Sequence, residues 1–255
     1  MNLGIIGCGA IGNDVAKAAD KMKDIEKIYL FDIKPTASKK LCTSLNKAEI
    51  KPVKDFLNNV DVVFEAASQA AVEEYAEIVV EAGKDLVIMS VGSLLNENFR
   101  KNLEKIAKEK RCKIYLPSGA VCGIDGILSA STDVIDEVTL VTTKPTESLN
   151  KRVDRRTVVF EGNARNALKK FPMNINVAAS LSLAGVGFDK TKVEIVADPV
   201  ATRISHKILA HGKFGRLRAE VENMPNPNNP KSSYMASLSA IATLNRIINP
   251  IQIGA

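Results

Sequence analysis

Short apolar runs alternate with amphipathic stretches through the first half of the chain. The runs have the length of buried strands, and the stretches between them place apolar residues at helical spacing, as at Val72, Ala76 and Val79. This alternation predicts an α/β fold in which a parallel sheet is built from strands joined by crossover helices. The predicted strands are residues 3–6, 27–31, 60–65, 86–89 and 114–117.

After about residue 119 the pattern changes to longer stretches in which every second residue is apolar. Such alternation is typical of strands with one buried face, and predicts an open antiparallel or mixed sheet. The predicted strands are residues 137–143, 192–197 and 215–223, and the predicted helices are 163–171 and 174–183. Residues 224–230 hold three prolines and three asparagines and are interpreted as a loop. A final helix, capped by Ser232 or Ser233, ends before Pro250.

The first predicted strand runs into a glycine turn that opens a helix predicted over residues 11–22. The turn reads Gly7-Cys8-Gly9-Ala10-Ile11-Gly12. Glycines at this spacing permit a tight turn, a close approach of backbone amides to a pyrophosphate, and close packing of helix against strand. The turn therefore predicts a dinucleotide cofactor, NAD or NADP. The residues predicted to hold its phosphates are Gly7, Gly9, Ala10, Ile11 and Gly12.

Asp32 ends the second predicted strand and predicts which dinucleotide binds. It follows Gly12 by about 20 residues, where an acidic residue reaches the adenine ribose hydroxyls. Its carboxylate favours NAD because it would repel the 2′-phosphate of NADP. Lys34 could pair with that phosphate, so NADP remains an alternative cofactor. The alternative is a solvated carboxylate at a strand end. Ser68 and Gln69, after the third strand, either contact the cofactor or cap the next helix.

Together these patterns predict three segments. Residues 1–118 form an NAD(P)-binding domain of the Rossmann type, and residues 119–231 form an α+β domain for catalysis and dimerisation. Residues 232–255 form a C-terminal helix that packs back on the first domain. A sheet with one open face also suits a two-fold homodimer.

Composition excludes several classes of protein. The net charge of +6 comes from interspersed residues, and with 5% aromatic residues and no Trp there is little material to stack nucleic-acid bases. No apolar run approaches the ~20 residues that a membrane span needs, and the first residues enter a strand, so a cytoplasmic protein is expected. Four scattered cysteines favour neither a metal site nor disulfides.

The chain has two histidines, His206 and His211. Residues around His206 alternate like a strand, which would point its ring away from Ser205 and Lys207. Because histidine titrates near neutrality, His206 is a candidate proton acceptor, the alternative being a core or surface histidine without a role. His211, beside Gly212, is interpreted as a turn residue.

Five stretches resemble the L-aspartate dehydrogenase family, and the resemblance extends over essentially the whole chain. They are residues 65–69 (EAASQ), 89–92 (MSVG), 116–120 (LPSGA), 174–179 (NINVAA) and 228–233 (NNPKSS). The resemblance implies oxidation of L-aspartate with NAD or NADP to iminoaspartate, which feeds NAD synthesis or hydrolyses to oxaloacetate and ammonia.

The same resemblance assigns roles to single residues. His206 matches the family's catalytic histidine, while Ala120 and Asn176 match positions that contact the nicotinamide end of the cofactor. The family's motif places an acidic residue after the histidine, whereas this chain has Lys207. A cation there would disfavour a protonated imidazole.

The two carboxylates of L-aspartate need cations or several hydrogen-bond donors once they leave water. Asn174 and Lys231 are the residues favoured for this role. The other candidates, each of which could equally be a solvated surface or turn residue, are Asn176, Ser118, Gly119, Lys144 and Arg165.

Two other functions fit the same pattern. One is an imine reductase of the dihydrodipicolinate reductase type, although the chain lacks that family's paired-histidine segment. The other is a non-catalytic NAD(P) sensor, against which His206 and the polar residues 174–176 argue.

Overall fold

The computed structural model describes residues 1–149, 153–171 and 176–253. Contacts among these residues divide the chain into two compact units. The first comprises Met1–Pro117 and Ser237–Ile251, and the second comprises Ser118–Ala236 and the residues after Ile251. Most of the last helix therefore belongs to the first unit, and its first residues, up to Ala236, belong to the second.

The first unit is built on a parallel sheet of six strands in its described residues, in the order β3-β2-β1-β4-β5-β6. Strand order reverses between β1 and β4, the switch point where such sheets bind ligands at their carboxyl ends. Every predicted strand is present, but β3 was missed because it is a short, partly exposed edge strand. The bounds are β1 Asn2–Ile6, β2 Lys27–Phe31, β3 Ala48–Ile50, β4 Val62–Glu65, β5 Asp85–Ile88 and β6 Ile114–Tyr115.

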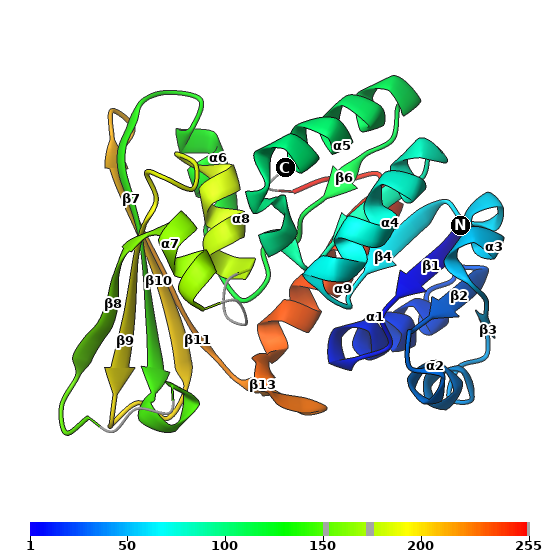
Figure 1. Cartoon of the computed structure of the whole chain (residues 1–255), viewed down its shortest axis with the longest axis horizontal. Coiled ribbons are helices and arrows are strands. Elements are labelled where there is room, and N and C mark those ends of the chain that lie inside the picture. Colours follow the sequence, from blue (N-terminus) through cyan, green and yellow to red (C-terminus); the bar gives the residue numbers. More distant parts are fainter. Residues whose placement is uncertain (150–152, 172–175, 254–255) are drawn as a thin grey trace. The chain divides into compact units, whose positions relative to one another are not determined.

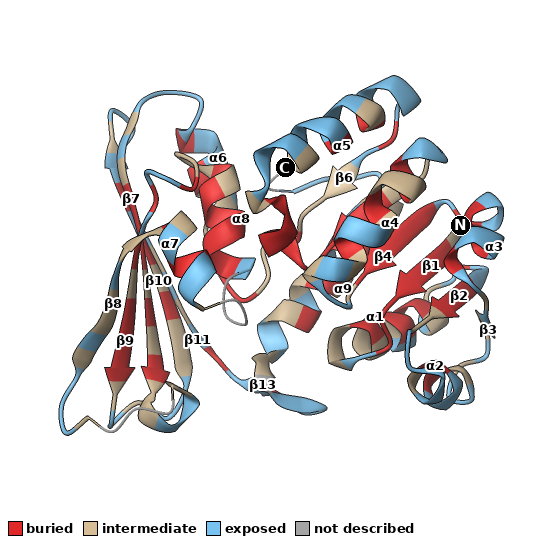
Figure 2. Cartoon of the chain, viewed as in Figure 1, coloured by how far each residue is buried: buried red, intermediate tan, exposed pale blue. Residues whose placement is uncertain are grey.

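Helices connect these strands (Figure 1), and the apolar faces of the helices are buried. Figure 2 shows that β1 and β4, at the centre of this sheet, are almost entirely buried. α4 is capped at its start by Ser68, whose hydroxyl oxygen accepts from the Ala71 N–H at 3.2 Å. The helices are α1 Ala10–Lys21, α2 Pro35–Cys42, α3 Val53–Phe56, α4 Gln69–Glu81 and α5 Glu97–Lys110, with 3-10 turns at Leu57–Asn59 and Val91–Leu95.

The second unit contains a five-stranded sheet in its described residues, in the order β11-β10-β7-β9-β8. β7 and β9 run parallel, and the other neighbouring strands run antiparallel. The sheet is therefore mixed, as one of the two expected sheet types was, and the purely antiparallel alternative is wrong. β8 was missed because a bulge after Val158 interrupts its alternation. The bounds are β7 Ile135–Pro145, β8 Thr157–Asn163, β9 Lys192–Asp198, β10 Ile204–Gly212 and β11 Gly215–Asn223.

Three helices, α6 Ile124–Ala130, α7 Ala164–Lys170 and α8 Asn176–Ala184, cover one face of this sheet (Figure 1). Gly126 lies so close to the sheet that a Cβ there would stand 2.6 Å from the Leu217 side chain. We call the helix-covered face the inner face and the opposite one the outer face. The predicted start of α8, Asn174, lies outside the described residues.

The loop predicted over residues 224–230 is wrong. Pro225–Asn226 (β12) pairs antiparallel with Asn229–Ser233 (β13). The Asn226 side-chain oxygen accepts from the backbone N–H groups of Asn228 and Asn229 at 2.7 and 3.2 Å and closes the turn. Prolines are tolerated because an edge strand needs few N–H donors. The last helix, α9, spans Tyr234–Ile248. Among the described residues, no helix is both long and apolar enough for a membrane span.

Candidate functional site

The glycine turn between β1 and α1 is shaped by contacts that exclude side chains. Gly7 has φ +98°, a left-handed conformation that favours glycine, and a Cβ on Gly12 would lie 1.9 Å from the Gly7 carbonyl oxygen. Gly9, by contrast, faces open space, because a Cβ there would have no atom within 4 Å. The turn is therefore closed on the side of the protein and open above Gly9.

Asp32 holds this turn from the end of β2. Its Oδ2 accepts from the Cys8 N–H at 2.8 Å, and its Oδ1 accepts from the Lys34 N–H at 2.7 Å. The carboxylate is thus hydrogen-bonded to the glycine turn rather than simply solvated. Burial raises the pKa of the neighbouring Cys8 thiol to about 12, so this cysteine stays protonated and serves as a small packed residue.

These residues fit a dinucleotide. α1 begins at Ala10, so the N–H groups of its first turn point toward the space above Gly9, and no acidic side chain lies in that turn. A helix N-terminus of this kind attracts phosphate through its free N–H groups and its dipole. Asp32 adds an acceptor for hydroxyl groups at the neighbouring strand end.

Glu65, the last residue of β4, is a buried carboxylate that sequence reasoning did not single out. It is 2% exposed and accepts four hydrogen bonds, which come from the N–H groups of Ala67, Ser68 and Ser90 and from the Ser90 hydroxyl, at 2.8 to 3.0 Å. Burial raises the pKa of Glu65, and these hydrogen bonds oppose that rise. Glu65 ties the ends of β4 and β5 together directly behind Gly7, whose Cβ position lies 2.8 Å from the Ala66 backbone.

In the second unit, the inner face of the sheet changes from apolar to polar toward one end. Val138 and Leu140 on β7 are followed at the same face by Thr142 and Lys144. On β10 the buried inner-face residues are Ala210 and Ile208, followed toward the same end by His206. His206 is in register with Thr142 of β7. On β11 the series ends in buried Asn223, opposite Ile204. We call Thr142, Lys144, His206 and Asn223 the polar end.

His206 is held at the polar end by its neighbour. Its Nδ1 lies 3.0 Å from the Thr142 Oγ1, and its side chain is 6% exposed. Burial, with a smaller contribution from the charge of Lys144, lowers the pKa of His206 to about 4. The imidazole is therefore neutral at pH 7 and can accept a proton.

Lys207 was expected to disfavour protonation of His206, and this expectation is wrong. Lys207 stands on the outer face and pairs with Glu220 at 3.3 Å. Lys144, from the neighbouring strand, acts on His206 instead. Side chains of consecutive strand residues point to opposite faces, so the chain neighbour of His206 is not its spatial neighbour.

The remaining predicted residues lie in several places. The Ala120 carbonyl accepts from the Asn223 side chain at 3.1 Å, and the Asn223 Oδ1 accepts from the Ser233 hydroxyl at 2.6 Å, which joins Ala120 to the polar end. Asn176 is the first residue of α8, and Lys231 lies on β13. Arg165 forms a two-pronged ion pair with Asp189, at 2.5 and 2.8 Å.

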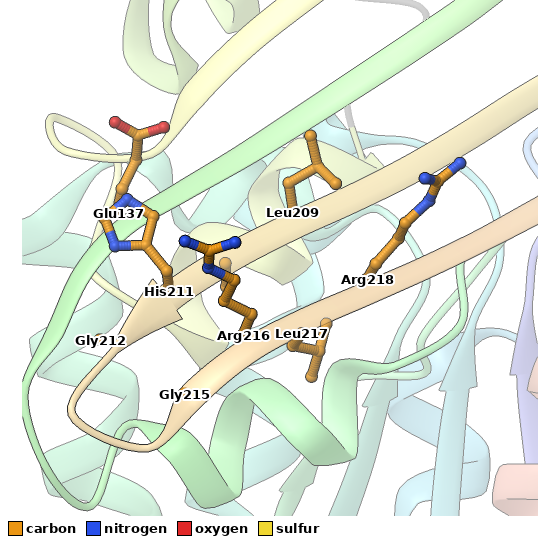
Figure 3. Close-up of a pocket in the computed structure, with 9 residues that line it drawn as sticks. Glu137, Leu209, His211, Gly212, Gly215, Arg216, Leu217 and Arg218 are labelled. Carbon is orange, nitrogen blue, oxygen red and sulfur yellow. The ribbon is translucent and has the colours of Figure 1, made fainter.

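A separate cavity of about 610 Å³ opens on the outer face, at the hairpin of β10 and β11 (Figure 3). His211, Arg216 and Arg218 reach into it, and Leu209 lies between them. His211 is in register with Arg216, on strand β10 and not in the turn that was expected. This cavity lies on the opposite face of the sheet from His206.

Comparisons with known proteins agree with this division of the chain. Residues 7–117 match the model of the homoserine dehydrogenase NAD binding domain, and residues 125–247 match that of the aspartate dehydrogenase C-terminal domain. An L-aspartate dehydrogenase from Methanosarcina barkeri is 45% identical over 100% of this chain and 99% of its own.

The chain belongs to the L-aspartate dehydrogenase family.

Solved structures agree with this membership. The crystal structure of aspartate dehydrogenase from Thermotoga maritima superimposes with a TM-score of 0.83 at 31% identity and covers 99% of both chains. A dihydrodipicolinate reductase from Paenisporosarcina reaches a TM-score of 0.54 at 12% identity, covering 96% of this chain and 92% of its own. That second likeness shows a shared fold alone.

Sequence patterns did carry a signal for the buried polar residues that were not singled out as catalytic. Thr142 and Asn223 are polar residues at positions where the alternation demands apolar ones. Lys144 is a third such residue, and it was already a candidate for binding the substrate carboxylates. Polar side chains are costly there unless they are hydrogen-bonded or functional. Glu65 carried a weaker signal, as an acid closing an apolar strand.

Two glycine variants separate folding from cofactor binding in this family member. We expect Gly12→Ala to lower stability by about 1–3 kcal/mol, because its Cβ would collide with the Gly7 backbone. Gly9→Ala should melt like the wild type, since its φ of −71° suits alanine, yet bind NADH at least about tenfold more weakly. Thermal unfolding and NADH fluorescence titration measure both. Wild-type NADH affinity in Gly9→Ala would contradict the assignment.

Proposed function

We propose that the protein oxidises L-aspartate to iminoaspartate with NAD or NADP and thereby supplies a precursor for NAD synthesis. The observation that carries this proposal is a neutral, buried histidine at the polar end of the second sheet, in a chain that matches L-aspartate dehydrogenases over its full length. The iminoaspartate either leaves as such or hydrolyses to oxaloacetate and ammonia.

The first unit binds the cofactor. The N–H groups of Gly9, Ala10, Ile11 and Gly12 hold the pyrophosphate, and Asp32 accepts from the adenine ribose hydroxyls. The N–H of Gly7 donates to the Phe31 carbonyl at 2.8 Å, so Gly7 contributes by shaping the turn. When bound, the nicotinamide ring supplies the acceptor for the hydride that leaves Cα of the substrate. Ala120 and Asn176 contact the nicotinamide end, as the family resemblance implies. Ser68, besides capping α4, lies at the strand end where cofactors bind in this fold.

His206 acts on the amino group of the substrate. The ammonium must lose a proton before its nitrogen lone pair can form the C=N bond that replaces the Cα–H bond. In the tautomer whose Nδ1–H donates to the Thr142 Oγ1, Nε2 is the ring atom that takes that proton. Asn174 and Lys231 are proposed to bind the substrate as well.

Use of NADP and a cytoplasmic location belong to the same proposal. Lys34 is exposed beside Asp32 and can meet a 2′-phosphate. The four cysteines are free thiols, which suits a reducing compartment.

A homodimer through the outer face is also proposed. Leu209 is exposed there, and the outer face of the neighbouring strand β11 carries both signs of charge, with Arg216 and Arg218 followed by Glu220 and Glu222. A two-fold axis would bring the same open face of two copies together, the self-complementary arrangement that a dimer needs.

The reaction itself is tested by absorbance of the reduced nicotinamide. We expect the band to grow when enzyme is mixed with L-aspartate and NAD, and more slowly with NADP, because Asp32 repels a 2′-phosphate. L-glutamate, L-alanine and D-aspartate serve as comparison substrates. Growth with another amino acid but not with L-aspartate would overturn the substrate.

The role of His206 is tested with a matched histidine. We expect His206→Ala to lower kcat about a hundredfold or more while NAD affinity stays within twofold, because a proton acceptor is lost. His211→Ala, on the outer face of the same strand, should keep wild-type kcat. Equal kcat values in the two variants would contradict the assignment of His206.

The dimer is tested by sedimentation equilibrium. The wild type should sediment with the mass of two chains, and Leu209→Glu with the mass of one, because the new carboxylate would be buried in the interface. Leu128→Glu, which alters an exposed leucine on α6, is the control and should remain dimeric. A wild type that sediments as a single chain would refute the dimer.

A further inference from the structure

Lys144 is a buried lysine beside the proposed proton acceptor. It is 4% exposed, although lysine is among the residues least often buried, because its ammonium group loses hydration at a large cost. It stands on the inner face of β7, two residues beyond Thr142, and is in register with Ala197 of β9. The sheet therefore places Lys144 at the polar end with His206.

Several other charged residues at this end of the sheet stand on the outer face. Asp198, Lys207, Glu220 and Glu222 line a separate cavity of about 280 Å³ together with Arg156 and Arg203. The side chain of Asp198 turns to its own loop, where it accepts from the Val200 N–H at 3.0 Å. On the inner side, α8 carries no charged residue along Asn176–Ala184. On the described strands, the inner face at the polar end thus presents a lysine and a histidine and no carboxylate.

Two groups that both become cationic stand close together on this face. Burial lowers the pKa of Lys144 to about 8, and the charge of Lys144 helps to lower the pKa of His206. An anion bound there would relieve both effects, because it would stabilise the ammonium of Lys144 and the proton that His206 accepts. Among small ligands, a carboxylate matches a lysine through a charge-assisted hydrogen bond.

We propose that Lys144 binds one carboxylate of L-aspartate and so holds the substrate on the inner face of the sheet beside His206. This rests on the proposed function and adds to it the residue that selects an acidic substrate. Lys144 is a substrate-binding residue in this proposal, and the proton transfer remains with His206. Binding of the anion also makes His206 a stronger base at the moment when the substrate ammonium must lose its proton.

Steady-state kinetics of lysine variants test the proposal. We expect Lys144→Met to raise KM for L-aspartate roughly 10- to 100-fold, the range set by loss of a hydrogen bond to a charged group. The KM for NAD should stay within twofold, and Lys144→Arg should recover part of the loss. Lys207→Met removes the same charge from the outer face one residue from His206, and it should keep the wild-type KM.

A role of Lys144 in folding alone predicts a different result. Methionine fills a similar volume without a buried charge, so Lys144→Met should melt no lower than the wild type. If KM for L-aspartate in Lys144→Met stays within twofold of the wild type, the proposal is wrong.

Direct binding separates this proposal from the proposed reaction. Calorimetric titration of succinate, a dicarboxylate without an amino group, into the protein with NADH should show affinity that falls at least tenfold in Lys144→Met. Such a loss supports Lys144 even if L-aspartate were not oxidised, and unchanged affinity would overturn it.

Two monoamides of L-aspartate identify the carboxylate. L-Asparagine lacks the side-chain carboxylate and L-isoasparagine lacks the α-carboxylate. The amide whose affinity no longer depends on Lys144 lacks the group that Lys144 binds. If both amides lose as much affinity in Lys144→Met as L-aspartate does, Lys144 binds neither carboxylate and the proposal is wrong.

Discussion

The register between β7 and β10 is the constraint on which the polar end depends. It pairs His206 with Thr142 and places Ile208 opposite Leu140, so that apolar and polar positions on the two strands coincide. A shift of one residue would turn His206 to the outer face. The packing of Leu140 and Ile208 under the helices therefore holds the histidine in place, although neither residue takes part in the chemistry.

The nucleotide unit obeys a comparable constraint through backbone contacts. Gly12 packs on the Gly7 carbonyl, and Gly7 packs on Ala66, which follows Glu65. Glu65 in turn holds the N–H groups at the ends of β4 and β5. The contacts of Gly7 and Gly12 leave no room for an additional atom, so the shape of the phosphate-binding turn is set by its neighbouring strands and not by the turn alone.

Much of this arrangement is readable from the sequence because period and alternation are local. Strand β11 occupies the predicted residues 215–223, and the glycine turn lies where its spacing placed it. Contacts between distant residues are not readable in this way. Asn223 reaches the Ala120 carbonyl across 103 positions of the chain.

Sequence neighbours can also mislead. Lys207 was expected to act on His206 because it follows it in the chain, but consecutive strand residues point to opposite faces of the sheet. The β12–β13 hairpin was missed since its prolines and asparagines are also typical of loops.

The two hydrogen bonds accepted by Asp32 have a consequence for changing the coenzyme of this enzyme by design. The carboxylate that would reject a 2′-phosphate is also the acceptor for the Cys8 N–H inside the glycine turn. Removing it to admit NADP would leave that N–H without its partner and loosen the turn for either coenzyme. Coenzyme preference and the geometry of the phosphate site are therefore linked, and a designed switch needs a second substitution that restores an acceptor for Cys8.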